Sequence, residues 1–213
     1  MLYLPDSVIS EIEKDDNKII ELSGLPDAGT SSASIFILKE LDGYGLYIGH
    51  KQNTSQIELY KRYLGNDSDR VLVTILDEPE PTKETLLKYI HFLGAEVDTI
   101  IIDNFAYYIL NRPRSYIKNL ISLLYSKAIE LNTRIIIINQ LRYDVYNHRE
   151  ANNTMAPLKT LYKDYLSQHV DLRLECHRSE ENNQDIYIEI AKKDSPKKEE
   201  SLLSKTVRDM LSK

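Results

Sequence analysis

The stretch Lys18–Ser32, KIIELSGLPDAGTSS, contains the clearest structural signal in the chain. Its first part, Lys18–Leu22, is a short apolar run that predicts a buried β-strand. A polar segment with two glycines follows, and Ser31–Leu41 then carries apolar residues at helical spacing. The stretch therefore predicts a strand, a tight turn and a helix in direct succession.

The alternation of strands and helices continues along most of the chain. Further strands are predicted at Leu46–Ile48, Arg70–Leu76, Val97–Ile102 and Arg134–Ile138. Further helices are predicted at Ser55–Leu64, at Thr82–Leu93 and from Pro113 to Leu131. Several of these strands are continuous apolar runs, which is typical of strands that helices cover on both faces. We therefore expect an α/β fold of three layers, with a mostly parallel sheet between two layers of helices.

The pattern changes toward the C-terminus. Val170–Cys176, VDLRLEC, and Asp185–Ala191, DIYIEIA, alternate between apolar and polar residues and are joined by a polar turn, SEENNQ. This predicts an antiparallel pair at one edge of the sheet with one face exposed. We expect a core domain over residues 1–194, then a charged linker and a short amphipathic helix over residues 195–213.

The composition is that of a globular protein with room for one sizeable domain, with 213 residues of which 42% are hydrophobic. The net charge of −6 argues against a strongly basic nucleic-acid binder. Cys176 is the single cysteine, which excludes an intramolecular disulfide and a zinc site made of several cysteines. The N-terminus lacks the pattern of a signal peptide, and no apolar run approaches the roughly 18 residues of a membrane span. We therefore expect an intracellular protein, in the cytoplasm or nucleoid, or in the nucleus of a eukaryote.

The turn after the first strand has the spacing of a phosphate-binding loop, G-x-x-x-x-G-K-[ST]. In such a loop backbone N–H groups hold the phosphates, the Lys supplies positive charge and the Ser or Thr coordinates magnesium. Gly24, Gly29 and Ser31 fit this pattern, but Thr30 stands where the Lys belongs. We expect this change to weaken nucleotide binding and to remove charge stabilisation from the transition state. Taken alone, the stretch is equally compatible with an ordinary glycine-rich turn.

Five stretches lie in the order and approximate spacing of one known protein core. They are IIELSGLPDAGTSS, YIGHKQ, VDTIIIDNF, RIIIINQLR, and LKTLYKDYLSQHVDLRLECHR followed by IYIEIAKKD. Over roughly residues 18–194 the chain thus resembles the RecA-type recombinase family, as a divergent paralogue with a degenerate Walker A motif. The most specific part is INQLR, which is similar to the segment that leads into the second DNA-binding loop of that family. The resemblance implies a RecA-like core of the P-loop class.

The resemblance also implies roles for individual residues. Asp103, at the end of an apolar strand, matches the acidic residue that helps to hold magnesium, although a strand-end Asp that caps a turn is an alternative. Gln140 matches the residue that senses the γ-phosphate. Lys51 stands where the family has its catalytic carboxylate, and a Lys cannot act as a general base there. ATP with magnesium is thus expected only if nucleotide binding is retained, and the residues implied for it are Gly24, Gly29, Thr30, Ser31 and Asp103, with Ser31 and Asp103 on the metal.

Two loops hold single-stranded DNA in that family. The first corresponds to NFAYYILNRPRS, which is short here. The second corresponds to residues 142–156, in which cations lie among aromatic residues, a composition that suits phosphate contact and base stacking. The candidate DNA-binding residues are Arg142, Tyr143, Tyr146, His148 and Arg149. A solvated loop with ordinary tyrosines remains the alternative.

The favoured function is that of a RecA-like paralogue without efficient ATP hydrolysis, which assists recombination or repair by binding DNA or a partner. The expected partner is a recombinase or another RecA-like subunit, in a dimer or a heteromeric complex rather than a self-assembling filament. One alternative is an active, divergent, phage-type recombinase in which Lys51 or Lys193 of a neighbouring copy supplies the missing charge. A second alternative is a structural partner with the RecA fold and no DNA contact.

Overall fold

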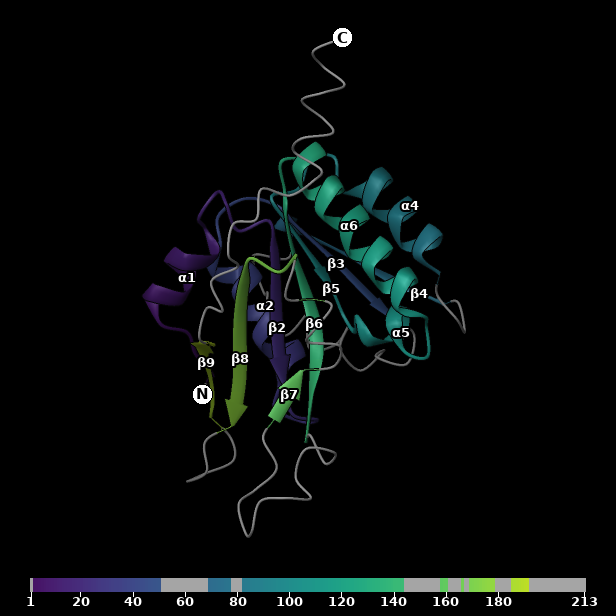
Figure 1. Cartoon of the computed structure of the whole chain (residues 1–213). Coiled ribbons are helices and arrows are strands. Elements are labelled where there is room, and N and C mark those ends of the chain that lie inside the picture. Colours follow the sequence, from purple (N-terminus) through teal and green to yellow (C-terminus); the bar gives the residue numbers. More distant parts are fainter. Residues whose placement is uncertain are drawn as a thin grey trace.

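The computed structural model describes residues 2–50, 69–77, 82–143, 158–160, 166, 169–178 and 185–191 (Figure 1). The strands are β1 (Leu2–Tyr3), β2 (Ile19–Gly24), β3 (Gly45–His50), β4 (Val71–Leu76), β5 (Thr99–Ile102), β6 (Arg134–Tyr143), β7 (Leu158–Thr160), β8 (Leu172–Arg178) and β9 (Ile186–Ile190). The helices are α1 (Asp6–Ile12), α2 (Thr30–Glu40), α4 (Lys83–Leu93), α5 (Ala106–Ile109) and α6 (Arg114–Glu130). None of the described helices is long and apolar enough to cross a membrane.

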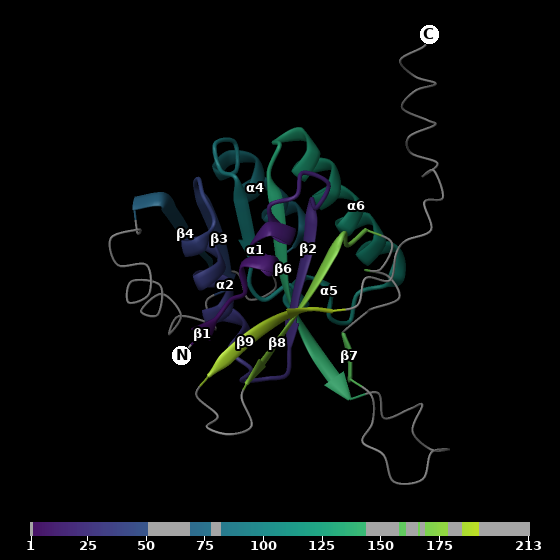
Figure 2. The ribbon, with the colours of Figure 1, turned by 90° about the vertical axis from the view of Figure 1, so that its left-hand side faces the viewer.

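The strands form a sheet in the order β1-β9-β8-β2-β6-β5-β3-β4, and β7 pairs with β6 outside this row. From β8 to β4 all neighbours are parallel, whereas β8 and β9 are antiparallel. The mostly parallel sheet with an antiparallel pair near one edge is therefore confirmed. The short β1 pairs with the outer side of β9 and so forms the edge itself, which the sequence did not predict. Figure 2 shows this side of the sheet facing the viewer.

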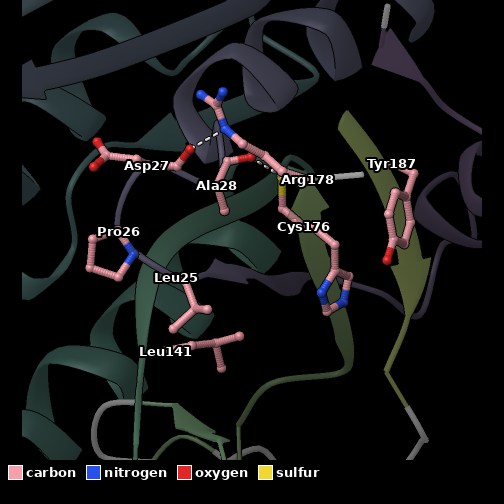
Figure 3. A pocket seen from close by; sticks show the side chains of 9 residues that line it. Leu25, Pro26, Asp27, Ala28, Leu141, Cys176, Arg178 and Tyr187 are labelled. Carbon is pink, nitrogen blue, oxygen red and sulfur yellow. Dashed lines mark hydrogen bonds between the residues drawn. The ribbon is translucent and has the colours of Figure 1, made fainter. Parts of the chain in front are cut away.

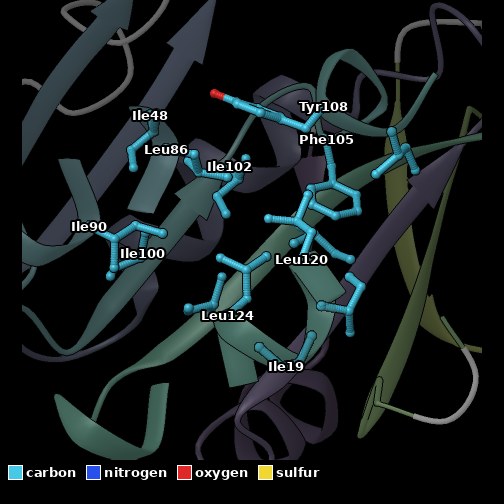
Figure 4. Close-up of a cluster of buried hydrophobic side chains, with 14 of the residues drawn as sticks. Ile19, Ile48, Leu86, Ile90, Ile100, Ile102, Phe105, Tyr108, Leu120 and Leu124 are labelled. Carbon is cyan, nitrogen blue, oxygen red and sulfur yellow. The ribbon is translucent and has the colours of Figure 1, made fainter. Parts of the chain in front are cut away.

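Helices cover both faces of the sheet, and this explains why its central strands are unbroken apolar runs. On β2, Ile19 packs with α4 and α6, while Ile20 on the opposite face packs with α1 and α2. The same alternation is seen on β6, where Ile135 and Ile136 belong to different clusters. Figure 4 shows the first cluster, with side chains from the strands meeting those of α4 and α6. The three-layer architecture expected from the sequence is thus confirmed.

Local sequence explains where several helices begin and end. The Thr82 hydroxyl accepts a hydrogen bond from the backbone N–H of Thr85 and so caps α4, which ends at Leu93 directly before Gly94. Pro113 immediately precedes α6, where its missing N–H costs no helical hydrogen bond. The helix α1 was not predicted. The predicted helix at Ser55–Leu64 and the predicted C-terminal segment lie outside the described residues.

The strand β6 is longer than the sequence predicted, because it continues beyond Ile138 to Tyr143. Up to Gln140 it pairs with β2, and its last three residues pair with β7 in antiparallel register. The end of β6 and β7 project from the body of the sheet (Figure 2). The sequence did not predict this extension because the strand was identified by its continuous apolar run, and several residues of Asn139–Tyr143 are polar.

A buried ion pair lies within the central strands. Glu21 of β2 has a fully buried side chain, and its carboxylate lies 2.9 Å from Nε of Arg173 on the neighbouring strand β8. The amide of Asn139 on β6 donates a second contact of 2.7 Å to the same carboxylate. Burial raises the pKa of Glu21, and the contacts with Asn139 and Arg173 oppose that rise. Three neighbouring strands are thus joined by one polar cluster.

We predict that Arg173→Met lowers the free energy of unfolding by about 3–5 kcal/mol, because it leaves a buried carboxylate without its cation. The pKa of Glu21 in the folded protein is already raised above its ordinary value of 4.5, and loss of Arg173 raises it further. The folded variant therefore holds this proton more tightly than the unfolded chain, so its stability is greatest below pH 4.5 and falls as the pH rises through the folded pKa. Urea unfolding at several pH values measures this.

The control is the double variant Glu21→Gln, Arg173→Met, in which both charges are removed and Asn139 keeps an oxygen acceptor. It should recover most of the lost stability and show no pH dependence from this position. Equal losses in the single and the double variant would contradict the assignment of the stability loss to an unpaired carboxylate.

Candidate functional site

The end of β2, the residue after β5 and Gln140 of β6 lie together on the side of the sheet to which the carboxyl ends of the parallel strands point. The polar residues identified in the sequence line a pocket of about 370 Å³ there. Ligands bind preferentially on this side of open parallel sheets because loops and helix N-termini gather there. The pocket is lined, among others, by Gly24, Gly29–Ser32, Asp103, Gln140 and Arg178. The structure thus brings together the residues that the resemblance implied for nucleotide binding.

The loop Gly24–Ser31 has the backbone shape needed to present N–H groups to a ligand. Gly29 adopts a left-handed conformation with φ of 87°, and a Cβ there would collide with Ile186 of β9. The helix α2 begins at the next residue and has no side-chain cap. Because the first N–H groups of a helix have no partner within it, this terminus presents donors and partial positive charge to the pocket.

Thr30 occupies the position at which the phosphate-loop pattern has a lysine. It packs closely on the first glycine of the loop, since a Cβ added to Gly24 would lie 2.7 Å from Cγ2 of Thr30. The same Cβ would lie 3.0 Å from the carbonyl oxygen of Cys176 on β8. Close packing on two sides therefore requires glycine at position 24, and the Thr30 side chain brings a methyl group rather than a charge.

Ser31 and Asp103 come together although they belong to different elements. Asp103 follows β5, is 3% exposed, and accepts a hydrogen bond of 2.5 Å from the hydroxyl of Tyr47. Burial raises the pKa of Asp103, and hydrogen bonds from the side chains of Ser31 and Tyr47 oppose that rise. A hydroxyl next to a carboxylate supplies the hard oxygen ligands that magnesium prefers, so these two residues fit a magnesium ion.

Gln140 is held in place by its neighbour in β6. Its backbone N–H donates to Oδ1 of Asn139 at 2.9 Å, and the other end of that amide donates to Glu21. The side chain of Gln140 lies on the lining of the pocket. The buried polar cluster of the sheet thus extends to the edge of the candidate site.

The structure adds a cation to the loop that the sequence did not predict. Arg178, the last residue of β8, donates a hydrogen bond from Nε to the backbone oxygen of Asp27 (Figure 3). Its side chain lines the same pocket as Ser31. It was missed because only the loop itself, Lys51 and Lys193 of a neighbouring copy were considered as sources of this charge. The available signal was its place two residues beyond a predicted strand.

The strand β3 ends directly before Lys51, the position at which the resemblance places the catalytic carboxylate of the family. The last residue of β3 is His50, which is buried and stacks on Tyr107 with ring centroids 4.6 Å apart. Burial and the nearby charge of Asp103 raise the pKa of Tyr107, which lines the pocket. Lys51 and the other residues up to 68 lie outside the described residues.

The candidate DNA-binding segment begins where β6 passes beyond the sheet. Arg142 pairs with Lys159 of β7, and Tyr143 pairs with Leu158. Residues 144–157 therefore connect β6 to β7, and the pairing of these two antiparallel strands begins at Leu141, directly beyond Gln140. Of the candidate residues in this segment, Tyr146, His148 and Arg149 lie outside the described residues, as does Lys193. The stretch proposed as a short first loop contains α5 and leads directly into α6.

Comparisons with known proteins were made by sequence and by structure. No protein-family model and no curated protein matches the sequence. Among solved structures 152 chains match. One is the crystal structure of the RadB recombinase, which is similar over 77% of this chain and 76% of that chain with a TM-score of 0.56 and 10% sequence identity. At this identity the likeness concerns the fold, and it shows that the chain has a RecA-type recombinase-like fold.

Proposed function

We propose that this chain is an intracellular RecA-like paralogue that binds a nucleoside phosphate without hydrolysing it efficiently. It assists recombination or repair by contacting single-stranded DNA or another RecA-like subunit. The observation that carries the proposal is the contrast within one pocket. The loop, Ser31 and Asp103 lie together in an arrangement suited to a phosphate group and magnesium, whereas Thr30 supplies no charge.

Three features support binding of an anion. The uncapped start of α2 presents N–H donors. The guanidinium of Arg178 lines the pocket and is tied to the loop at Asp27. Ser31 and Asp103 would hold a magnesium ion, which would supply positive charge next to the phosphates.

Two features oppose efficient hydrolysis. A lysine in the loop stabilises charge that develops on the transferred phosphate, and Thr30 cannot replace it. A carboxylate that orients the attacking water is also needed, and at the carboxyl end of β3 the described residue is the stacked imidazole of His50. We therefore expect slow hydrolysis, because the loop has no lysine and the resemblance places Lys51 where the carboxylate belongs.

An active, divergent recombinase remains the second candidate, and one observation favours it. Arg178 brings a permanent positive charge to a loop that has lost its lysine. A guanidinium binds phosphate with fixed, planar geometry, which differs from the flexible ammonium of a lysine. The two candidates share nucleotide binding and differ in turnover.

We predict that phosphate release from ATP stays at the level of the protein-free control, with and without single-stranded DNA. Thr30→Lys should not restore turnover, because the residue that orients water is still missing. A phosphate-release assay with magnesium measures this. If DNA stimulates turnover and Asp103→Ala abolishes it, the active recombinase is the correct function.

We predict that Arg178→Ala weakens binding of a fluorescent ATP analogue by about 10- to 100-fold, which is the range expected for loss of a charge-assisted hydrogen bond. Arg178→Lys should lose less, since it keeps the charge but not the planar geometry. The matched control is Lys88→Ala on the exposed surface of α4, which removes one positive charge far from the loop and should leave affinity unchanged. Equal affinities of the Arg178→Ala variant and the wild type would exclude this residue as the replacement for the lysine.

We predict that residues 142–156 carry any binding of single-stranded DNA, because an acidic chain with a net charge of −6 needs a local cluster for it. Substituting Arg142 and Arg149 with Ala should lower affinity and flatten its salt dependence. Substituting Tyr143 and Tyr146 with Ala should lower affinity by about 1–3 kcal/mol per stacked base, with little change in salt slope.

Fluorescence anisotropy of a labelled oligonucleotide over a salt series measures both effects. The control is Tyr44→Ala, which removes an exposed tyrosine before the amino end of β3, the opposite edge of the sheet. If the wild type binds DNA and all four substitutions leave affinity intact, the DNA contact lies elsewhere. If the wild type binds no DNA, the structural partner is the function that remains.

A further inference from the structure

A cluster of metal-ligating side chains lies on the antiparallel pair β8 and β9, outside the pocket of the loop. Glu175 of β8 stands directly opposite Glu189 of β9, and His177 stands opposite Tyr187. Residues two apart in a strand share one face, so Glu175, His177 and Glu189 project from the same face of the pair. One ligand atom from each lies within 4.8 Å of the other two.

The charges of this cluster are unbalanced without a further cation. Two carboxylates directly opposite each other repel. Nε2 of His177 lies 3.1 Å from Glu189 and 3.7 Å from Glu175. This nitrogen is shielded from solvent, yet its geometry forms no hydrogen bond with any described residue. The single N–H that this nitrogen can carry would serve at most one of the two carboxylates.

The ring of His177 is held in this orientation by its neighbour across the strands. It stacks on Tyr187 with ring centroids 5.2 Å apart and an interplanar angle of 22°. Glu175 and His177 are about one-third exposed or less, whereas the side chain of Glu189 is 60% exposed. Two ligands are therefore positioned by the sheet, and the third has the freedom to close on an ion.

We infer that Glu175, His177 and Glu189 form a binding site for a divalent transition-metal ion of the zinc type. One imidazole nitrogen and two carboxylate oxygens are a ligand set that such ions accept at about 2.0–2.2 Å, and imidazole favours them over magnesium or calcium. Ligand atoms at these distances lie within about 4.4 Å of one another, so a small rotation of Glu189 completes the set. Three protein ligands leave a coordination position for water or for a group of a bound molecule.

The proposed site lies on the two strands that also contact the loop Gly24–Ser31. The same two strands carry Arg178, which is bonded to Asp27, and Ile186, which packs against Gly29. His177 and Tyr187 also line a second pocket of about 530 Å³, which shares Leu25–Asp27 and Arg178 with the first (Figure 3). An ion bound by residues of both β8 and β9 would therefore restrict the relative motion of these two strands, which contact the loop through Arg178 and Ile186.

The test is a titration of the full chain with Zn²⁺ by calorimetry and with Co²⁺ by visible absorption, in buffer without chelator and without nucleotide. The wild type should bind one equivalent, that is, one metal ion per chain. His177→Ala should bind that ion at least about 100-fold more weakly, because the loss of a group that only orients a metal ligand already lowers metal affinity by about 10- to 100-fold. Glu175→Gln and Glu189→Gln should each weaken binding and alter the Co²⁺ spectrum. The control is His91→Ala, an exposed histidine of α4 that should keep the equivalent.

Thermal unfolding provides a second readout that does not depend on activity. Zn²⁺ should raise the Tm of the wild type and of His91→Ala, and leave that of His177→Ala unchanged, because an ion that binds only the folded state stabilises it. A normal Tm of His177→Ala without metal shows that the variant folds. If the wild type binds no Zn²⁺, or if all three ligand variants keep the same equivalent, the cluster is a contact of His177 with the two glutamates that holds no metal, and the inference is wrong.

Discussion

The parallel pairing of β2 with β6 is the interaction on which the rest of the structure depends. Its register runs from Ile19 opposite Ile135 to Gly24 opposite Gln140, so the start of the loop and the polar end of β6 emerge at the same edge. Helices bury alternate residues of both strands on opposite faces. A slip of one residue would exchange these faces and place Glu21 away from Asn139. The register that burial imposes therefore also sets the geometry of the candidate site.

The charges around the loop come from two strands, the negative charge from the end of β5 and the positive charge from β8 beside β2. Asp103 is buried, and its raised pKa reflects burial that two hydroxyl groups offset only in part. Positive charge reaches the pocket from Arg178 at the end of β8, because β8 runs parallel to β2 and ends beside the loop. A guanidinium tied to the backbone at Asp27 is suited to holding an anion in one place. It is less suited to following a group that moves during transfer.

The pair β8 and β9 connects the two sites that we propose. One face of β8 packs its apolar residues under α2, and Cys176 there donates to the backbone oxygen of Ala28 in the loop. Burial raises the pKa of that thiol to about 12, so it remains protonated and packs as a small apolar group. The opposite face carries Glu175 and His177. An ion bound on that face would be held by β8, the strand that contacts the loop through Cys176 and Arg178.

Periodicity and residue types within continuous segments are enough to predict the core strands and helices, the loop at Gly24–Ser31 and the strand-end position of Asp103. The sequence did not show α1, β1 or the extension of β6, where the apolar signal is short or interrupted. Only the tertiary structure decided which residues meet: Arg173 with Glu21, Arg178 with the loop, and His177 with two glutamates. These contacts depend on strand order and register, which place β8 between β2 and β9, and residues far apart in the chain carry no local pattern that records such neighbours.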